Sequence, residues 1–458
     1  MRWWVSQRNR AYQSDIMNTA RRISLALSCA FIFNFESVAH AAVFNIPDGD
    51  IGALKAAINA ANADGVADTI NLVPGGIYTL TAVDNSSNGL PVISDDGPGV
   101  DLTINGHGAT ILRAAGAPEF RILQINDAAE VSCNDLTIAG GKLTASLPAN
   151  AGGSIFLGHA TLSLTRCSLV DNLGGLGGAI YSDGGSLTVS GGAFQRNVAD
   201  AGPDGLRPAM GGAIANIGGA LVIDDTVLTA NRSDSAAGAI YTSGTARLTS
   251  STLSQNIASG LGGAIANDGE LTLISSEVNG NSSVGVGGGI HSTDALTLQR
   301  CTINGNGSNS SGGGINNFGM VTVDNCSFIS NNAGSRGGAI SSFQNDPAVP
   351  AVATERNSTF SNNSGVRGGA FGNFAATLTL LNSTISGNTA LVFGGAIHNQ
   401  NGIVTARAVT FTGNNAIDNA GIFNHSIPAQ PGPSPVLTIQ NCIFQLGELG
   451  VNLFNFGG

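Results

Sequence analysis

The 458-residue sequence is poor in charged and aromatic side chains, which make up 11% and 5% of the total. Glycine, with 65 residues, is abundant by contrast. This composition is typical of a chain with many turns and a core of small side chains. The length alone suggests two or three domains, an estimate that the internal repeat described below overrides.

Positive charge is scarce. The formal net charge is −11, and Lys55 and Lys142 are the two lysines of the chain. Nucleic acids and anionic lipids are bound by basic patches, so the sequence predicts neither as a partner. An acidic polysaccharide is also a poor electrostatic match for such a chain.

The cysteines do not form a recognisable framework. Beyond Cys29 there are five, an odd number at wide spacing, and no Cys-x-x-Cys pattern occurs: Cys133, Cys167, Cys301, Cys326 and Cys442. We therefore predict buried core thiols, with no metal site and no cofactor. Cys301 and Cys326 are expected to stack in adjacent repeats, where a disulfide between them is the alternative.

The first 41 residues have the pattern of an export signal. Arg21 and Arg22 precede the apolar run Ile23–Phe35, and Ala39-His40-Ala41 supplies a small-x-small cleavage pattern. The run is too short for a membrane span, and translation could begin at Met17. We expect an exported chain that is extracellular or associated with the cell surface or outer membrane, without a membrane span in its mature part.

A Gly-Gly-Ala-Ile tetrad returns about every 25 residues, each time followed by an apolar-x-x-Asn tag. A fixed period of this length indicates a solenoid, in which each repeat buries its apolar face against its neighbours. Close variants of the tetrad fill the longer gaps. The full tetrads are Gly177–Ile180, Gly211–Ile214, Gly262–Ile265, Gly337–Ile340 and Gly394–Ile397.

The segment Leu296–Asn306 illustrates one repeat. Leu296 and Leu298 alternate with Thr297, the period of a half-buried strand. A polar corner follows, and Cys301 and Ile303 then point inward. Three short strands and three corners predict one coil of a single-stranded parallel β-helix, and its crossovers should be right-handed.

The tag asparagines should stack along this all-β solenoid. Asparagine tolerates left-handed backbone angles and bonds its own turn, and stacked copies can pair amide to amide. The ladder is expected at Asn172, Asn197, Asn231, Asn256, Asn281, Asn306, Asn331, Asn363, Asn388 and Asn414.

The open strands at the start of a solenoid need a cover. Ile51, Leu54, Ile58 and Ala61 share one helical stripe, which predicts a short capping helix within 50–63. The predicted segments are a signal peptide at 1–41, the cap and first coils at 42–100, the β-helix at 101–447 and a short tail at 448–458.

These residues carry a resemblance. The tetrads, together with Phe194–Asn197, Phe328–Asn331 and Phe411–Asn414, resemble the repeats of chlamydial polymorphic outer membrane proteins. The opening from Leu54 to Ile70 is similar to the start of many exported β-helix proteins of the pectate-lyase-like superfamily. The first resemblance implies a surface adhesin, and the second implies the β-helix fold, in which lyases and glycosidases also occur.

Candidate catalytic residues are sparse. Asp224-Asp225 and Gly106-His107-Gly108 correspond to parts of the galacturonan hydrolase motifs, but the first and last motifs of that family are absent. The aspartates fall at a corner where polar pairs are ordinary, and His107 is favoured as a turn residue. We name no catalytic residue.

The position directly after the tetrad isoleucine is expected to face outward. It carries rings at Tyr181, Tyr241, His291 and His398. Rings on alternate coils lie roughly 10 Å apart, a spacing close to a disaccharide repeat, so these four residues are candidates for stacking on a glycan. The alternative is the general preference of exposed strands for aromatic residues.

The sequence therefore predicts an exported β-helix protein that acts as a non-catalytic, adhesin-like or structural binding module. Its partner would be a glycan or the surface of a host or neighbouring cell, and the oligomeric state is open. A polysaccharide lyase or glycoside hydrolase of the same superfamily is the alternative.

Overall fold

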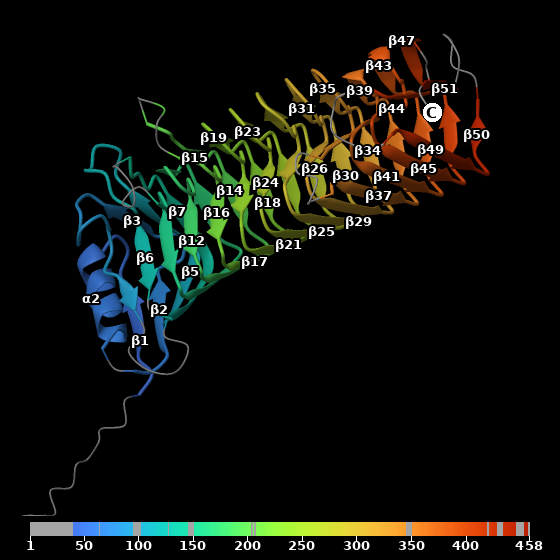
Figure 1. Ribbon diagram of the computed structural model, residues 1–458. Coiled ribbons are helices and arrows are strands. Elements are labelled where there is room, and N and C mark those ends of the chain that lie inside the picture. The colour runs from blue at the N-terminus through green and yellow to red at the C-terminus, as the bar shows by residue number, and fades with distance from the viewer. Residues whose placement is uncertain are drawn as a thin grey trace, which may run out of the picture. The chain divides into compact units, whose positions relative to one another are not determined.

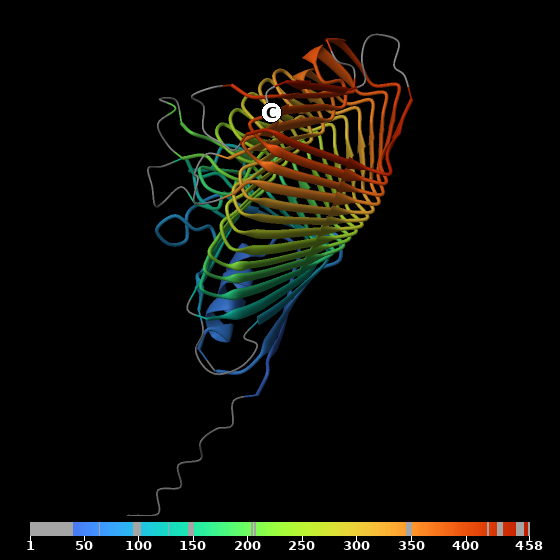
Figure 2. The same cartoon turned by 45° about the vertical axis from the view of Figure 1, so that its right-hand side comes forward.

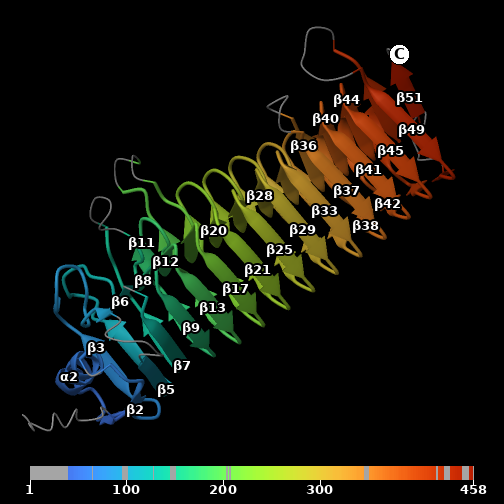
Figure 3. The same cartoon turned by 60° about the horizontal axis from the view of Figure 1, so that its bottom comes forward.

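Equivalent segments of successive repeats pair in parallel and build a right-handed β-helix in the computed structural model (Figures 1 and 3). Each repeat forms one coil, and Figure 2 shows the coils stacked from the first to the last. The predicted fold class is confirmed. The structure describes residues 40–63, 65–94, 102–126, 128–144, 151–202, 205, 208–344, 350–418, 421–427, 434–445 and 453–456. The signal peptide predicted at 1–41 lies almost entirely outside these ranges.

One sheet, here called the tetrad sheet, collects the strands that begin at or near the tetrad isoleucine. Its strands are β4 (Ile93–Ser94), β6 (Leu123–Asn126), β8 (Ile155–Gly158), β12 (Ile180–Asp183), β16 (Ile214–Ile217), β20 (Ile240–Thr242), β24 (Ile265–Asn267), β28 (Ile290–Ser292), β32 (Ile315–Asn317), β36 (Ile340–Phe343), β40 (Phe371–Phe374), β44 (Ile397–Gln400), β48 (Ile422–His425) and β51 (Leu453–Phe456). The last strand, β51, lies in the segment that was predicted to be a tail and pairs with β48.

A second sheet, the long sheet, has two columns of strands that merge in β5 and β7. The first column holds the Leu-Thr-Leu segments: β1 (Val43–Ile46), β2 (Asp68–Leu72), β5 (Leu102–Arg113), β7 (Glu130–Ala139), β9 (Thr161–Thr165), β13 (Ser186–Ser190), β17 (Ala220–Asp224), β21 (Thr245–Thr249), β25 (Glu270–Ile274), β29 (Ala295–Gln299), β33 (Met320–Asp324), β37 (Val352–Arg356), β41 (Thr377–Leu381), β45 (Ile403–Arg407) and β49 (Val436–Gln440).

The second column of the long sheet follows the corner. It consists of β3 (Ile77–Leu80), β10 (Ser168–Val170), β14 (Ala193–Gln195), β18 (Val227–Thr229), β22 (Thr252–Ser254), β26 (Glu277–Asn279), β30 (Thr302–Asn304), β34 (Ser327–Ile329), β38 (Thr359–Ser361), β42 (Thr384–Ser386), β46 (Thr410–Thr412) and β50 (Ile443–Phe444).

A short sheet follows the tag asparagine, so a coil has four strand segments where the sequence predicted three. Its strands are β11 (Leu173–Gly174), β15 (Val198–Ala199), β19 (Arg232–Ser233), β23 (Ile257–Ala258), β27 (Ser282–Ser283), β31 (Gly307–Ser308), β35 (Asn332–Ala333), β39 (Ser364–Arg367), β43 (Thr389–Phe393) and β47 (Asn415–Asp418).

The predicted capping helix is confirmed as α2 (Ile51–Ala61), beside β1, β2 and β3 at the first coils (Figure 1). The Asp50 carboxylate caps it by accepting a 2.9 Å hydrogen bond from the amide of Ala53. Leu54 and Ile58 are fully buried on its inner face. This is the one helix among the described residues, and it lacks the length that a membrane crossing requires.

The tag asparagines form the predicted ladder. The Nδ2 atom of Asn281, for example, donates to Oδ1 of Asn306 at 2.9 Å and to the carbonyl of Leu253 at 3.0 Å. The left-handed backbone, however, belongs to the residue before each tag, such as Gln255 (φ 56°) before Asn256. The asparagine side chain is thereby free to point inward, where it satisfies buried backbone groups.

The interior is one continuous apolar core that runs from Ile46 to Ile422. Phe328 and Phe360 stack in it with ring centroids 4.9 Å apart. Glu355 is the exception, since its carboxyl is fully buried between Val323 and Leu380. The five described cysteines are free thiols, and the amide of Cys301 donates to Sγ of Cys326 at 3.2 Å, so their predicted stacking is confirmed.

Candidate functional site

The four predicted ligand-binding residues do lie in one column of the tetrad sheet. Tyr181 pairs with Ala215, which pairs with Tyr241, and the register continues through Ala266 to His291. The same column reaches Gly372 and then His398. The register read from the sequence is therefore correct.

The expected exposure of this column is wrong for the two histidines. Tyr181 and Tyr241 are half-buried, whereas His291 is 4% and His398 1% exposed. Neighbouring side chains cover both histidines: His291 contacts the ring of Phe318 and the amide of Asn316, and His398 packs among Phe374, Phe393 and Phe423. The four side chains therefore do not form one exposed strip. Tyr241 is also engaged, because its hydroxyl donates to Asp268 at 2.8 Å.

The structure forms a different strip of rings on the outer face of the same sheet. It begins at His291 and Phe318, whose centroids are 5.6 Å apart, and proceeds through Phe343 at 5.9 Å and Phe374 at 6.4 Å. Phe374 then lies 5.2 Å from His398. Phe318, Phe343 and Phe374 project from the same face, two residues beyond the column predicted from the sequence.

The strip ends in a cluster of rings on the last coils. Phe393 and Phe423 stack at 4.5 Å with an interplanar angle of 10°, and His398 lies 5.7 Å from Phe423. Nε2 of His398 is 2.9 Å from Nε2 of His425. We call the set His291, Phe318, Phe343, Phe374, Phe393, His398, Phe423 and His425 the aromatic strip.

Two arginines flank this end of the strip. Arg336 and Arg367 precede successive tetrads and face each other across a parallel bridge. The guanidinium carbon of Arg336 lies 4.2 Å from the centroid of Phe374, a cation–π contact. Burial, with a contribution from Arg367, lowers the pKa of Arg336.

The histidines of the strip are held in the neutral form. Burial, followed by the charges of His425, Arg367 and Arg336, lowers the pKa of His398 to about 3. Burial also lowers the pKa values of His291 and His425. At neutral pH the imidazoles can donate or accept single hydrogen bonds, and the arginines carry the positive charge.

The catalytic candidates weighed from the sequence lie apart from the strip. Asp224 ends β17 and Asp225 follows it with φ 44°, so the structure places this exposed pair at a turn. Within the described ranges, no three His, Cys, Asp or Glu side chains gather closely enough to hold a metal ion.

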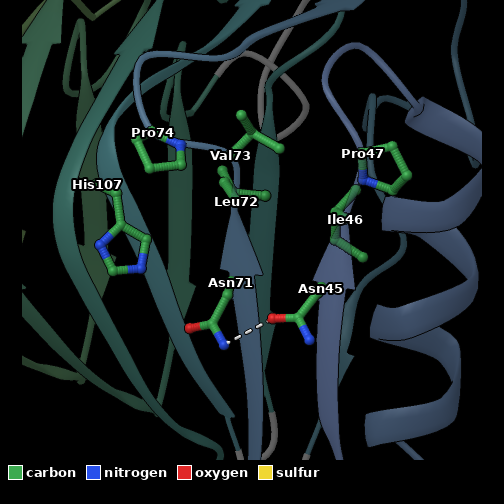
Figure 4. A pocket seen from close by; sticks show the side chains of 8 residues that line it. All are labelled: Asn45, Ile46, Pro47, Asn71, Leu72, Val73, Pro74 and His107. Carbon is green, nitrogen blue, oxygen red and sulfur yellow. Dashed lines mark hydrogen bonds between the residues drawn. The ribbon is translucent and has the colours of Figure 1, made fainter.

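A shallow pocket of about 610 Å³ lies over the first coils, beside His107 (Figure 4). His107 sits at a bulge in β5 with φ 51°, as expected for a turn residue. Asn71 donates to Asn45 at 3.2 Å along the pocket wall. His107 is the one titratable side chain in the lining, so the pocket offers little for catalysis.

Residues 382–400 match the repeat of the Chlamydia polymorphic membrane protein family. This stretch contains one tag asparagine, Asn388, and one tetrad, Gly394–Ile397. It confirms, for one repeat, the resemblance seen in the sequence. No curated protein matches the sequence of this chain.

Three solved structures are similar to this chain over most of its length. The A-module of mannuronan C-5 epimerase AlgE6 from Azotobacter vinelandii is 10% identical, with 88% of this chain and 97% of that one covered and a TM-score of 0.30. Tailspike protein 3 of bacteriophage CBA120 is 12% identical over 86% of this chain and 60% of its own, with a TM-score of 0.37. The periplasmic alginate epimerase AlgG is 8% identical over 88% and 84%, with a TM-score of 0.29. At these values no substrate or residue role transfers to this chain.

The sequence did contain a signal for the strip. Phe318, Phe343 and Phe374 all stand three residues after a tetrad isoleucine or its phenylalanine substitute. The sequence-based prediction of an outward column covered only the position directly after the isoleucine. Because side chains alternate between the two faces of a strand, the position two residues further is equally outward.

Proposed function

We propose that this chain is an exported, surface-associated binding module that holds a glycan along the aromatic strip on the outer face of the tetrad sheet. The observation that carries the proposal is the coil-by-coil contact of rings from His291 to Phe423. The half-buried rings of the strip offer a rigid surface to a chain-like ligand, and the buried rings of His291, Phe374 and His398 pack against them. Export is supported by the leader pattern at 1–41, and a surface location by the matched repeat at 382–400.

The rings are well placed for recognition. Phe318, Phe343, Phe393 and Phe423 are half-buried, so each has one part packed and another part open to solvent. Strand positions are more precise than loop positions, and a packed ring loses little entropy when a ligand binds. Rings also offer large apolar area, while His425 at the end adds a polar contact.

The test is a panel of polysaccharides presented to the full chain and scored for both binding and chain cleavage. Phe343→Ala and Phe393→Ala should each weaken binding of a captured glycan about 10-fold, the loss expected for about 1.4 kcal/mol of ring contact. Phe156→Ala is the matched control, because Phe156 is also half-buried on this face but contacts Tyr181 outside the strip. Binding that survives both strip variants, or that falls equally with Phe156→Ala, would refute the proposal.

A polysaccharide lyase or glycoside hydrolase is the second candidate. The observation that favours it is the neutral imidazole pair of His398 and His425 beside Arg336 and Arg367, since a neutral imidazole can act as a general base. Shortening of a polysaccharide that disappears in His425→Gln while binding persists would establish the enzyme. Binding without cleavage across the panel would favour the binding module.

A further inference from the structure

Arg336 and Arg367 form a pair of like charges on adjacent coils. A parallel bridge joins their backbones, and both side chains are half-buried. Within the described part of the chain, neither guanidinium has an ion-pair or side-chain hydrogen-bond partner. Like charges directly opposite on neighbouring strands destabilise a sheet, so this pair costs stability in the free protein.

Two other arginines, Arg166 and Arg196, are each neutralised by an aspartate one coil earlier. Arg166 donates through Nε to the carboxylate of Asp135 at 2.6 Å, one coil earlier. Arg196 does the same with Asp171 at 2.7 Å. Arg336, by contrast, has another arginine, Arg367, opposite it on the next coil.

Two buried nitrogen atoms near this pair have no hydrogen-bond partner. They are Nε of Arg336 and Nδ1 of His398, and the ring of Phe374 contacts both residues. Buried polar atoms are nearly always paired in native proteins, and an exception calls for a bound water, ion or ligand. These atoms and the unpaired charges occupy the same end of the aromatic strip.

We propose that Arg336 and Arg367 bind an oxyanion, a carboxylate or sulfate, carried by a ligand that lies on the aromatic strip. A guanidinium fork matches a carboxylate or sulfate in shape and charge. An anion between the two arginines removes their mutual repulsion and satisfies the Nε–H donor of Arg336, which is otherwise unpaired. His398 and His425 complete the corner as neutral hydrogen-bonding groups.

This site is a local exception in an acidic chain. The formal net charge is −11, so an anion is repelled by most of the surface and attracted only where positive charge gathers. Asp418 is an exposed carboxylate in the same register, two coils beyond Arg367, and on β47 it pairs with Phe393. It forms no ion pair with either arginine.

That the ligand is a glycan rests on the proposed function, whereas the anion site is inferred from the two arginines alone. The experiment compares neutral dextran, carboxymethyl dextran and dextran sulfate of equal length by calorimetry with the full chain at fixed ionic strength. Wild-type protein should bind at least one anionic dextran about 10-fold more tightly than the neutral polymer. The two anionic polymers separate a carboxylate ligand from a sulfate ligand.

Arg336→Gln and Arg367→Gln should each abolish that preference. Arg247→Gln is the matched control, because Arg247 lies on β21 of the long sheet, away from the strip. A wild-type protein without anion preference, or an equal loss in Arg247→Gln, would overturn the inference. Circular dichroism melting checks that the variants fold, and removal of one like charge should leave the melting temperature unchanged or raised.

The two proposals fail separately. If Phe343→Ala weakens glycan binding but anionic and neutral dextrans bind alike, the anion site is refuted and the strip remains. If no glycan binds, sodium sulfate alone should still raise the melting temperature of the wild type more than that of Arg336→Gln at matched ionic strength, which would support the anion site without the strip. Equal shifts would refute it.

Discussion

Nε2 of His398 lies 2.9 Å from Nε2 of His425 on the neighbouring strand, so one imidazole donates a hydrogen bond to the other. This bond requires at least one neutral ring. Burial, together with the smaller effects of His425, Arg367 and Arg336, lowers the pKa of His398 from 6.5 to about 3. The pair therefore links the stability of the last coils to pH.

We expect acid to destabilise the protein through His398. Between pH 6.5 and 3 the unfolded chain binds a proton that the folded chain does not, so the free energy of unfolding falls as the pH falls. At pH 4 this amounts to about 3 kcal/mol, at about 1.4 kcal/mol per pKa unit. Urea unfolding of the wild type and of His398→Gln at pH 7, 5.5 and 4 measures the difference in slope.

The control for this series is His107→Gln, since His107 is exposed at a bulge of β5. That variant should follow the wild-type pH dependence. If wild type and His398→Gln lose stability in parallel over this range, the neutral pair does not contribute to the acid sensitivity.

Glu355 should make the protein less stable as the pH rises. Its carboxyl is fully buried with both oxygens unpaired, and burial raises its pKa well above 4.5. Above pH 4.5 the unfolded chain releases this proton while the folded chain keeps it, so stability is lost as the pH rises toward the folded pKa. Glu355→Leu, which matches its neighbours Val323 and Leu380, should stabilise the protein by about 2 kcal/mol or more at pH 7 and remove this slope.

Glu270→Leu serves as the surface control, because Glu270 is exposed at the start of β25. It should change stability by less than about 0.5 kcal/mol. A destabilised Glu355→Leu would mean that the carboxyl has a function in the core that outweighs its burial.

Removal of one rung should show what the asparagine ladder contributes. Oδ1 of Asn281 accepts from the amide and the Nδ2 group of Asn256, both at 2.9 Å. Asn281→Ala leaves those donors and the carbonyl of Leu253 unpaired in the core, at a cost of about 2–4 kcal/mol. Asn304→Ala, at an exposed position on β30, should cost less than about 0.5 kcal/mol in the same denaturant titration. Equal costs for the two variants would show that the ladder adds nothing beyond its turn.

The second glycine of the tetrad is required by close backbone stacking. A Cβ on Gly263 would lie 2.0 Å from the carbonyl oxygen of Gly288 in the next coil. Gly263→Ala should therefore cost at least about 3 kcal/mol, the upper end of overpacking effects. Gly280→Ala is the control for backbone angle without steric overlap, because Gly280 has φ 63° and open space around it. This variant should lower the free energy of unfolding by about 1 kcal/mol. Thermal melting that ranks the two variants the other way would contradict this reading of the tetrad.

Much of the fold could be predicted because the repeat makes each position a column. The period of about 25 residues predicted the length of a coil, and the alternation of Leu296, Thr297 and Leu298 predicted a strand. The apolar stripe of α2 predicted the capping helix. The fourth strand segment of each coil was missed, since two residues such as Gly307–Ser308 carry no periodic signal of their own. The left-handed residue was placed one position too late, because the preference of asparagine for that angle is weaker than the demand for an inward-pointing amide.

The site was less predictable than the fold. The column of Tyr181 and His398 was placed correctly, but its exposure depends on rings of neighbouring coils, such as Phe374, that cover it. The arginine pair could not be predicted from the sequence either. Arg336 and Arg367 are 31 residues apart, and the net charge of the chain is negative, so nothing in the sequence indicated a local positive site.

The sequence by itself determined the coil, its period, and which residues alternate inward and outward, because a strand has a side-chain period of two and a solenoid repeats it in register. Only the tertiary structure decided which outward positions remain open and which charges meet. Those properties arise between coils, where a ring contacts the ring of the next repeat and an arginine meets either an aspartate or a second arginine. The aromatic strip and the arginine pair at its end are products of that stacking.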